Sequence, residues 1–443
     1  MSKKTRGVMA LVALCGLSLF LLNCGTSVNR SSGLLYVLSQ GTSAVSSYSI
    51  SLTSGALSLI NSNAKTCTTA PCGLPVNILL DPTGATAFVL NQGVFTPADA
   101  NQGVAQSGSV PSVYGYTVNS DGSLAVKGDL TTSSPPPLQN NCTQPPTVQG
   151  VFAACDLAVA MTRDAAGKFL FVITGGNQAS SPTMPPQLYV FNMQAGSTTL
   201  ALASQLALTR IPTGLAAIND PNSSNILLYV TSNKDLSSNL VKVDNALTEY
   251  TVDATSGALK EYDDPNTGFP YTTGGNPNAV VAVKTAPVGG NGGVFVYVAG
   301  GTSNSVGAYQ LCTLISSTCT SDDVTKNFKL VPVGTPPNAG ANPIAMVADP
   351  TSQFLYVVSE NSSQVFGFRI NATQGTLSAL SPANLSTGGQ PIAIAMHSTG
   401  KFLFVSNNGS SNVSAFAVDT LSGSMSSPSV VANPGQPAGL VSR

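Results

Sequence analysis

The sequence is poor in the residues that carry most protein chemistry. It has no tryptophan, one histidine (His397) and only 8% charged residues, against about a quarter in an average soluble protein. The net charge is −1 and no basic run follows residue 6, which argues against nucleic acid or an anionic membrane surface as a partner. With a single histidine, general acid–base chemistry near neutral pH has few candidates.

Uncharged polar and apolar residues take the place of the missing charges. Hydrophobic residues make up 42% of the 443 positions, which is enough for a substantial core. The apolar residues recur in a regular pattern, and this pattern excludes a disordered chain.

The N-terminus has the features of a bacterial export signal. Basic residues precede an apolar run at residues 8–22, which is shorter than the roughly 20 residues that a membrane-spanning helix needs. The run ends in Leu21-Leu22-Asn23-Cys24-Gly25, which resembles a lipobox, although Asn23 departs from the small residue usually found before the cysteine. We therefore predict a signal peptide at 1–23, a lipid anchor on Cys24 and a tether at 24–32. The alternatives are an ordinary signal peptide cut nearby and an uncleaved anchor.

Six further cysteines fall into three couples that are close in sequence. Couples of this kind suit disulfides in an oxidising compartment, and each would pin a local loop. A zinc site is the alternative, but no CxxC spacing occurs and His397 is distant in sequence from every cysteine. The couples are Cys67/Cys72, Cys142/Cys155 and Cys312/Cys319.

A short run of β-branched and aromatic residues recurs seven times at intervals near 60 residues. Four copies follow a tight-turn sequence, and in the clearest copies a proline opens a small apolar strand before that turn. The copies are Leu35-Tyr36-Val37, Phe88-Val89, Phe171-Val172, Tyr229-Val230, Tyr297-Val298, Tyr356-Val357 and Phe404-Val405.

Each copy continues with two more strand signals. The third strand carries an aromatic residue two positions before an aliphatic one, so both point to one face. A Gly-x-Leu or Gly-x-Met turn then marks a fourth strand in five units, and the fifth unit has the Cys312/Cys319 couple instead. The aromatic–aliphatic pairs are Tyr48/Ile50, Tyr116/Val118, Phe191/Met193, Tyr250/Val252, Tyr309/Leu311, Phe368/Ile370 and Phe416/Val418.

The two ends of the chain complement each other. Residues 435–441 match the first strand of a unit, whereas residues 34–40 match a second strand. The sequence therefore predicts an all-β fold: one seven-bladed β-propeller at residues 33–443, with four antiparallel strands per blade. The terminal strands share blade 1 and close the ring, which removes exposed sheet edges.

Residues 400–407, 412–419 and 422–423 carry a family resemblance. They are similar to the seven-bladed lactonase family that includes 6-phosphogluconolactonase, and they resemble the related YVTN-type surface repeats. These motifs are strand and turn signals, so they are specific for the fold and only weakly specific for activity. The resemblance implies hydrolysis of a sugar lactone. A phosphorylated substrate is not expected, because a phosphate site should collect several cations and the funnel offers only Arg210.

In propellers, ligands usually meet the central funnel on the face where second strands end and first strands begin. The residues predicted there are mostly neutral amides, and Glu360 is the one acid that follows a second strand. Asp156, Arg210 and Glu360 form the candidate charged constellation, and three unrelated solvated charges are the alternative. The amides predicted to line the ligand-binding funnel are Asn91, Asn233, Asn361 and Asn407.

His397 aligns with Asp81, Asp164 and Asp349 at the turn between first and second strands, on the face opposite the funnel. We therefore predict a turn residue and not a general base. The sequence also lacks a G-x-S-x-G elbow, a P-loop and EF-hand spacing. No cofactor and no metal site are predicted; a divalent metal ion stays open, but no pattern indicates one.

Long polar insertions follow the second strands of blades 2 to 4, and elaborated loops on one rim suit recognition. Neutral loop drift is the alternative. The leading hypothesis is an exported, lipid-anchored monomer in the bacterial cell envelope that binds a small-molecule, glycan or protein ligand at this rim and touches the membrane only through its anchor. The competing hypothesis is a lactone hydrolase that uses Asp156, Arg210 and Glu360.

Overall fold

The computed structural model describes residues 32–66, 74–92, 94–96, 107–109, 111–131, 157–176, 185–193, 200–221, 223–236, 242–262, 271–286, 292–312, 330–433 and 435–443. These residues form strands and turns, and no helix occurs among them. The part of the chain described here therefore has no helix long and apolar enough to cross a membrane.

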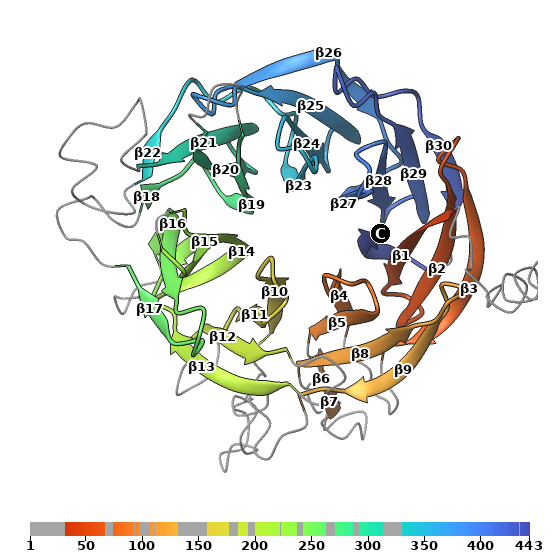
Figure 1. Cartoon of the computed structure of the whole chain (residues 1–443), viewed down its shortest axis with the longest axis horizontal. Helices are drawn as coiled ribbons and strands as arrows, with labels where there is room; N and C mark the ends of the chain where they lie inside the picture. The colour runs from red at the N-terminus through yellow and green to blue at the C-terminus, as the bar shows by residue number, and fades with distance from the viewer. Residues whose placement is uncertain are drawn as a thin grey trace, which may run out of the picture.

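Seven sheets stand side by side in a ring (Figure 1), which confirms the predicted seven-bladed propeller. The innermost strands of blades 1 to 7 are β31 (Pro437–Ser442), β4 (Leu74–Leu80), β10 (Ala158–Arg163), β14 (Arg210–Asn219), β19 (Pro277–Lys284), β23 (Pro343–Ala348) and β27 (Pro391–Met396). The second strands are β1 (Ser32–Ser39), β5 (Thr86–Gln92), β11 (Phe169–Thr174), β15 (Ile226–Asp235), β20 (Val294–Gly300), β24 (Phe354–Ser359) and β28 (Phe402–Asn407).

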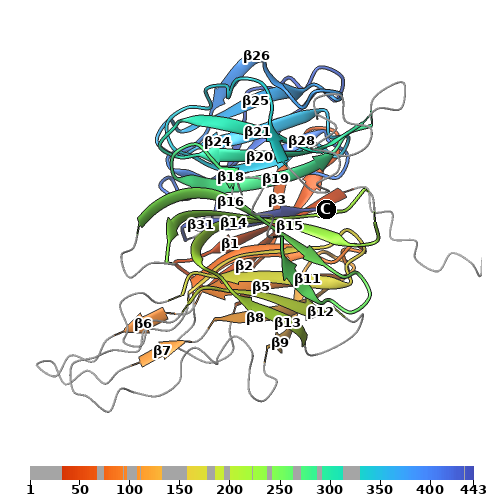
Figure 2. The ribbon, with the colours of Figure 1, turned by 90° about the vertical axis from the view of Figure 1, so that its left-hand side faces the viewer.

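The outer half of each blade is built in the same way. The third strands are β2 (Ala44–Ser51), β8 (Ser112–Val118), β12 (Gln187–Asn192), β16 (Lys242–Val252), β21 (Ser305–Leu311), β25 (Gln364–Ile370) and β29 (Asn412–Ala417). The outermost strands are β3 (Leu57–Lys65), β9 (Leu124–Asp129), β13 (Ala201–Ala207), β17 (Leu259–Glu261), β22 (Leu330–Pro332), β26 (Leu377–Ser386) and β30 (Ser429–Ala432). Blade 4 gains β18 (Tyr271–Thr272), which pairs with β16, and β6 (Val94–Thr96) pairs with β7 (Ser107–Ser109) in a hairpin that projects from the ring (Figure 2).

Blade 1 contains both ends of the described chain, as the sequence predicts. Strand β31 pairs antiparallel with β1, with Tyr36 opposite Val441 and Val37 opposite Leu440. Backbone bonds join Leu34 N to Arg443 O at 3.1 Å and Arg443 N to Leu34 O at 2.9 Å. The last strand therefore supplies the inner edge of the first blade.

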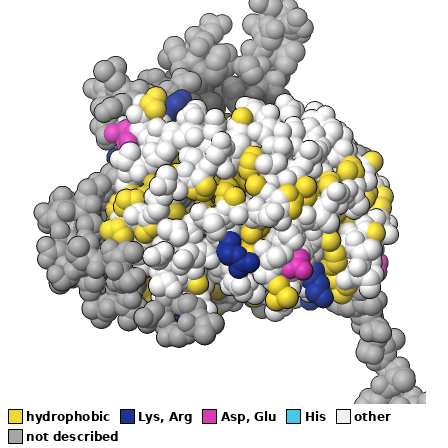
Figure 3. Space-filling view, turned by 90° about the horizontal axis from the view of Figure 1, so that it is seen from above, with side chains coloured by type: hydrophobic (Ala, Val, Ile, Leu, Met, Phe, Trp, Pro, Cys, Tyr) yellow, Lys and Arg dark blue, Asp and Glu magenta, His cyan; other side chains and the backbone are white. Residues whose placement is uncertain are grey.

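The core lies between the blades. Second strands such as β24 and β28 are buried along their whole length, because a neighbouring blade covers each face. The predicted third-strand pairs pack into these interfaces; Tyr48 and Ile50, for example, are 1% and 0% exposed. The edge of the ring shown in Figure 3 is mostly uncharged polar surface, in keeping with the 8% content of charged residues.

The predicted Gly-x-Leu turns also join neighbouring blades. Gly375 of blade 6 has a φ of +69° and lies over Phe295 of blade 5, where an added Cβ would come within 2.1 Å of the ring. The hydroxyl of Tyr297 donates to Gly375 O at 2.9 Å across the same interface. Only glycine combines this backbone conformation with so close an approach.

Candidate functional site

The ring has two different faces. On the funnel face, second strands end and innermost strands begin; Glu360, which directly follows β24, lies there beside Asn342, which directly precedes β23. On the hairpin face, tight turns join innermost to second strands, as at residues 81–84, 164–167, 349–352 and 397–400. The predicted site residues belong to the funnel face.

Glu360 is half-buried and held in place by a neighbouring amide. Asn342 Nδ2 donates to Glu360 Oε2 at 2.8 Å. Asn342 has a φ of +55° and is fixed in turn by its own N–H, which donates to Asn304 Oδ1 at 3.1 Å. Among the described residues, no hydrogen bond is made to the other carboxylate oxygen of Glu360. That oxygen is free to accept a hydroxyl.

A series of asparagine side chains continues from Glu360 across two further blades. Asn278 Nδ2 donates to Asn342 Oδ1 at 3.0 Å, Asn276 Nδ2 donates to Asn278 Oδ1 at 3.3 Å, and Asn233 Nδ2 donates to Asn276 Oδ1 at 3.0 Å. We call Asn233, Asn276, Asn278, Asn342 and Glu360 the asparagine chain. It fixes the orientation of amides from blades 4, 5 and 6 along one stretch of the funnel face.

Arg210 and Glu360, the two described members of the predicted charged group, each bind a different partner. Arg210 begins β14, and its Nε forms an ion pair with Asp244 Oδ2 at 3.0 Å, with the two side chains 18% and 33% exposed. Glu360 is bound by Asn342 in blade 6, and Asp156 lies outside the described residues. No hydrogen bond or ion pair joins Arg210 to Glu360 in the described part of the chain.

The four predicted funnel amides differ in their exposure. Asn233 belongs to the asparagine chain, and Asn361 is exposed beside Glu360. Asn91 and Asn407 are only 1% and 0% exposed. Asn91 donates to Thr66 O at 2.7 Å, just after the outermost strand of blade 1, and Asn407 donates to Asn412 Oδ1 at 2.7 Å within blade 7. These two side chains hold strand ends together, and their burial does not favour a place on the open funnel wall.

The cysteine predictions fall mostly outside the described residues. Cys312, next to the end of β21, is 1% exposed. Cys24, Cys67, Cys72, Cys142, Cys155 and Cys319 lie outside the described ranges. The lipid anchor and the three pairings therefore stay predictions.

His397 occupies the turn between β27 and β28, as the repeat alignment predicts. Gly400 N donates to His397 O at 2.8 Å, and the ring Nδ1 lies 2.8 Å from Thr399 Oγ1. Burial lowers the pKa of His397, and a hydrogen bond to the main chain of Arg443 opposes that effect. The ring is 3% exposed and caps a turn on the hairpin face.

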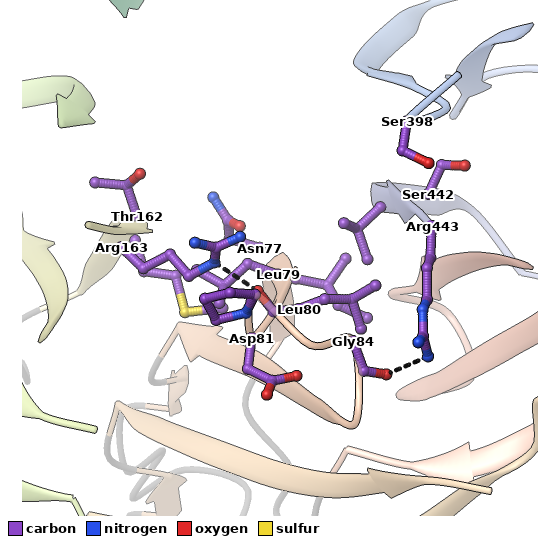
Figure 4. Close-up of a pocket in the computed structure, with 14 residues that line it drawn as sticks. Asn77, Leu79, Leu80, Asp81, Gly84, Thr162, Arg163, Ser398, Ser442 and Arg443 are labelled. Atoms are coloured by element: carbon purple, nitrogen blue, oxygen red, sulfur yellow. Dashed lines mark hydrogen bonds between the residues drawn. The ribbon is translucent and has the colours of Figure 1, made fainter. Parts of the chain in front are cut away.

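A cavity of about 580 Å³ opens on the hairpin face between blades 7, 1, 2 and 3 (Figure 4). Its walls carry Arg163 and Arg443 together with the polar side chains of Asn77 and Thr162. A second cavity of about 390 Å³ follows the innermost strands toward Gln40. We call the first the hairpin-face pocket and the second the channel.

Sequence reasoning found the two ends of the asparagine chain, Asn233 and Glu360, but missed the three asparagines between them and the pocket arginines. A signal for the chain exists, because an amide residue with positive φ precedes the opening proline in four units, at Asn276, Asn342, Gln390 and Gln436. No such signal marks Arg163 and Arg443, which converge on one hairpin from different blades. Within the described residues, no three His, Cys, Asp or Glu side chains gather as a metal site would require.

These features define a seven-bladed β-propeller with a hydrogen-bonded series of amides on its funnel face. No protein-family sequence profile matches the chain, and no curated protein sequence matches it. Its fold is similar to that of a candidate 6-phosphogluconolactonase from Bacteroides fragilis, with a TM-score of 0.60, 13% identity and coverage of 94% of this chain and 99% of that one.

Two further solved structures share the fold. A candidate 6-phosphogluconolactonase from Bacteroides uniformis has a TM-score of 0.62 at 11% identity, covering 93% of this chain and 100% of its own. The periplasmic gluconolactonase PpgL from Pseudomonas aeruginosa has a TM-score of 0.58 at 16% identity, and the match covers 93% of this chain and 98% of that one. At these identities the likeness establishes the fold alone.

Proposed function

We propose that the protein is an exported, lipid-anchored, monomeric propeller that binds a polyhydroxylated ligand, a glycan or a sugar derivative, on its funnel face. The observation that carries this proposal is the asparagine chain, which ends at Glu360. Asn276 and Asn342 each donate one Nδ2 hydrogen bond within the chain and keep a second N–H, and the carboxylate accepts strongly from hydroxyl groups. Fixed, neutral hydrogen-bonding groups beside one carboxylate match the chemistry of sugar hydroxyls.

The proposal is tested by calorimetric titration of the purified full chain with a panel of monosaccharides, disaccharides and sugar lactones. We expect at least one panel member to bind. Glu360→Gln should lower the affinity for that ligand roughly tenfold or more, because a hydrogen bond to a charged group contributes about 1.5–3 kcal/mol. Glu261→Gln in the outer strand β17 is the control and should bind like the wild type. Absence of binding across the panel, or an unchanged affinity in Glu360→Gln, would contradict the proposal.

A lactone hydrolase is the second candidate function. It is favoured by the described activities of the structural neighbours, a periplasmic gluconolactonase among them. Arg210 and Glu360 would polarise and position the lactone, with Asp156 as a further acid. Turnover of a sugar lactone that Glu360→Gln abolishes would support hydrolysis over binding alone. Binding without turnover would support the first function.

Export is proposed from the N-terminal sequence, with the mature chain starting at Cys24 and disulfides within the three cysteine couples. Metabolic labelling with a fatty acid tests the anchor. The label should be incorporated into the wild type and be lost in Cys24→Ala, while Cys15→Ala within the signal keeps it. Equal labelling of Cys24→Ala and the wild type would exclude this anchor.

A further inference from the structure

Two arginines approach the same hairpin from opposite sides of the hairpin-face pocket. Arg163 of blade 3 donates from Nε to Leu80 O at 2.7 Å, and Arg443 of blade 1 donates from Nη1 to Gly84 O at 2.9 Å (Figure 4). Arg163 Nη1 also donates to Asp164 O at 2.9 Å. Main-chain carbonyls thus orient both guanidinium groups within the wall of a cavity of about 580 Å³.

Neither guanidinium forms an ion pair with a described carboxylate, although Asp164 and Asp81 lie near enough for their charges to act on Arg163. Among the described residues, no ion pair includes Arg163 or Arg443, and the Nη2 group of each makes no hydrogen bond. Asp81 lines the same pocket, but Thr86 N donates to its Oδ1 at 2.8 Å and Thr83 Oγ1 to its Oδ2 at 2.6 Å. The arginines therefore keep donors for an external anion.

The pocket adjoins a channel whose side chains are mostly aliphatic, while polar atoms make up the larger part of its accessible lining. Asn77 and Ile78 line both cavities, so the two cavities are adjacent. The channel runs toward Gln40 on the funnel face, and most of its lining side chains are hydrocarbon. Those side chains are Val76, Ile78, Val159, Ile344, Ala345, Ile392, Ala393, Ile394, Ala438 and Leu440.

We propose that the hairpin-face pocket binds the carboxylate of an aliphatic organic acid, a medium-chain fatty acid, whose hydrocarbon tail occupies the channel. Charge-assisted hydrogen bonds from Arg163 and Arg443 hold the carboxylate, and the channel removes the tail from water. This site lies on the face opposite the asparagine chain and is independent of the function proposed there.

The alternative is that Arg163 and Arg443 only join neighbouring blades and bind no ligand, because a cation also joins blades elsewhere in the ring. Lys168 donates to Ala254 O at 2.6 Å and to Thr255 O at 2.7 Å in the neighbouring blade. Lys168 does not line the hairpin-face pocket. Lys168→Gln is therefore a matched control: it removes a cation that joins blades and leaves the pocket intact.

The test is calorimetric titration of the full chain with octanoate, octanol and gluconate. Octanoate should bind at least tenfold more tightly than octanol, which lacks the charge, and gluconate, which lacks the apolar tail. Affinity should rise about fourfold per methylene from butanoate to octanoate. Arg163→Gln should lower the affinity for octanoate at least tenfold, while Lys168→Gln should bind octanoate like the wild type.

Thermal unfolding of each variant shows whether it folds, and Arg443→Gln replaces Arg163→Gln if the latter does not. Equal affinity for octanoate and octanol, preference for gluconate, or no binding of octanoate would overturn the proposal. So would an equal loss of affinity in the arginine and Lys168 variants.

Discussion

At the scale of the residue, Glu249 is the least expected side chain of the ring. It lies in β16 opposite Tyr229 and is 0% exposed. Among the described residues, both of its carboxylate oxygens and the hydroxyl of Tyr229 are buried without a hydrogen-bond partner. The residues opposite the corresponding positions of the other second strands are small or aliphatic: Ser47, Gly115, Val190, Ala308, Gly367 and Ala415. A carboxylate in this place should hold its proton.

This predicts how stability depends on pH. Burial raises the pKa of Glu249 well above its usual value, and the charge of Asp220 adds to the effect. As pH rises above about 4.5, the unfolded chain loses the proton while the folded chain keeps it, so stability falls by up to about 1.4 kcal/mol per pH unit until the folded-state pKa is passed. Glu249→Gln removes this loss. Urea unfolding at pH 4, 6 and 8 should show that the free energy of unfolding of the variant increases relative to that of the wild type as pH rises.

Thr248 of the same strand, which is 3% exposed, provides the comparison. Thr248→Val changes no titratable group, so it should differ from the wild type by a nearly constant amount across these pH values. A pH-independent difference for Glu249→Gln would mean that Glu249 is ionised in the folded protein.

At the scale of the element, each Gly-x-Leu turn is a contact surface for the preceding blade. Tyr36, Tyr297 and Tyr356 donate to the turn carbonyls of Gly122, Gly375 and Gly423 at 3.0, 2.9 and 2.7 Å. Blade 5 lacks this turn sequence, and the hydroxyl of Tyr229 in blade 4 has no hydrogen-bond partner in the described part of the chain. The irregular fifth unit in the sequence thus accounts for an orphaned hydroxyl in the neighbouring blade.

The turn glycines give a prediction about stability. Gly375→Ala should destabilise the protein by about 2–4 kcal/mol, because it combines a left-handed backbone with a clash against Phe295. Gly400→Ala is the control: its φ is +72°, close to that of Gly375, but an added Cβ meets nothing nearer than 3.6 Å. Urea unfolding should place Gly400→Ala closer to the wild type. Equal losses would show that backbone strain alone decides the effect.

At the scale of the whole molecule, the sequence predicts the ring far better than the site. Strand and turn signals repeat locally, so seven copies and two complementary ends are enough to infer closure. The asparagine chain joins Asn233 to Glu360 through residues of three blades. Such contacts depend on how the blades are placed around the axis, and no local pattern encodes that. The sequence therefore predicts Arg210 and Glu360 as members of one group because they share a face, whereas in the structure Arg210 pairs with Asp244 and Glu360 is bound by Asn342.

Ring closure itself can be tested by removing its last strand. Deletion of residues 437–443 takes β31 from blade 1 and exposes the edge of β1, so we expect a lower midpoint of thermal unfolding and a tendency to aggregate. A synthetic peptide of residues 437–443 should restore the midpoint in proportion to its concentration, because it re-forms the pairs of Tyr36 with Val441 and of Val37 with Leu440. A scrambled peptide of the same composition should not. Rescue by both peptides, or an unchanged midpoint in the truncated chain, would show that blade 1 does not depend on β31.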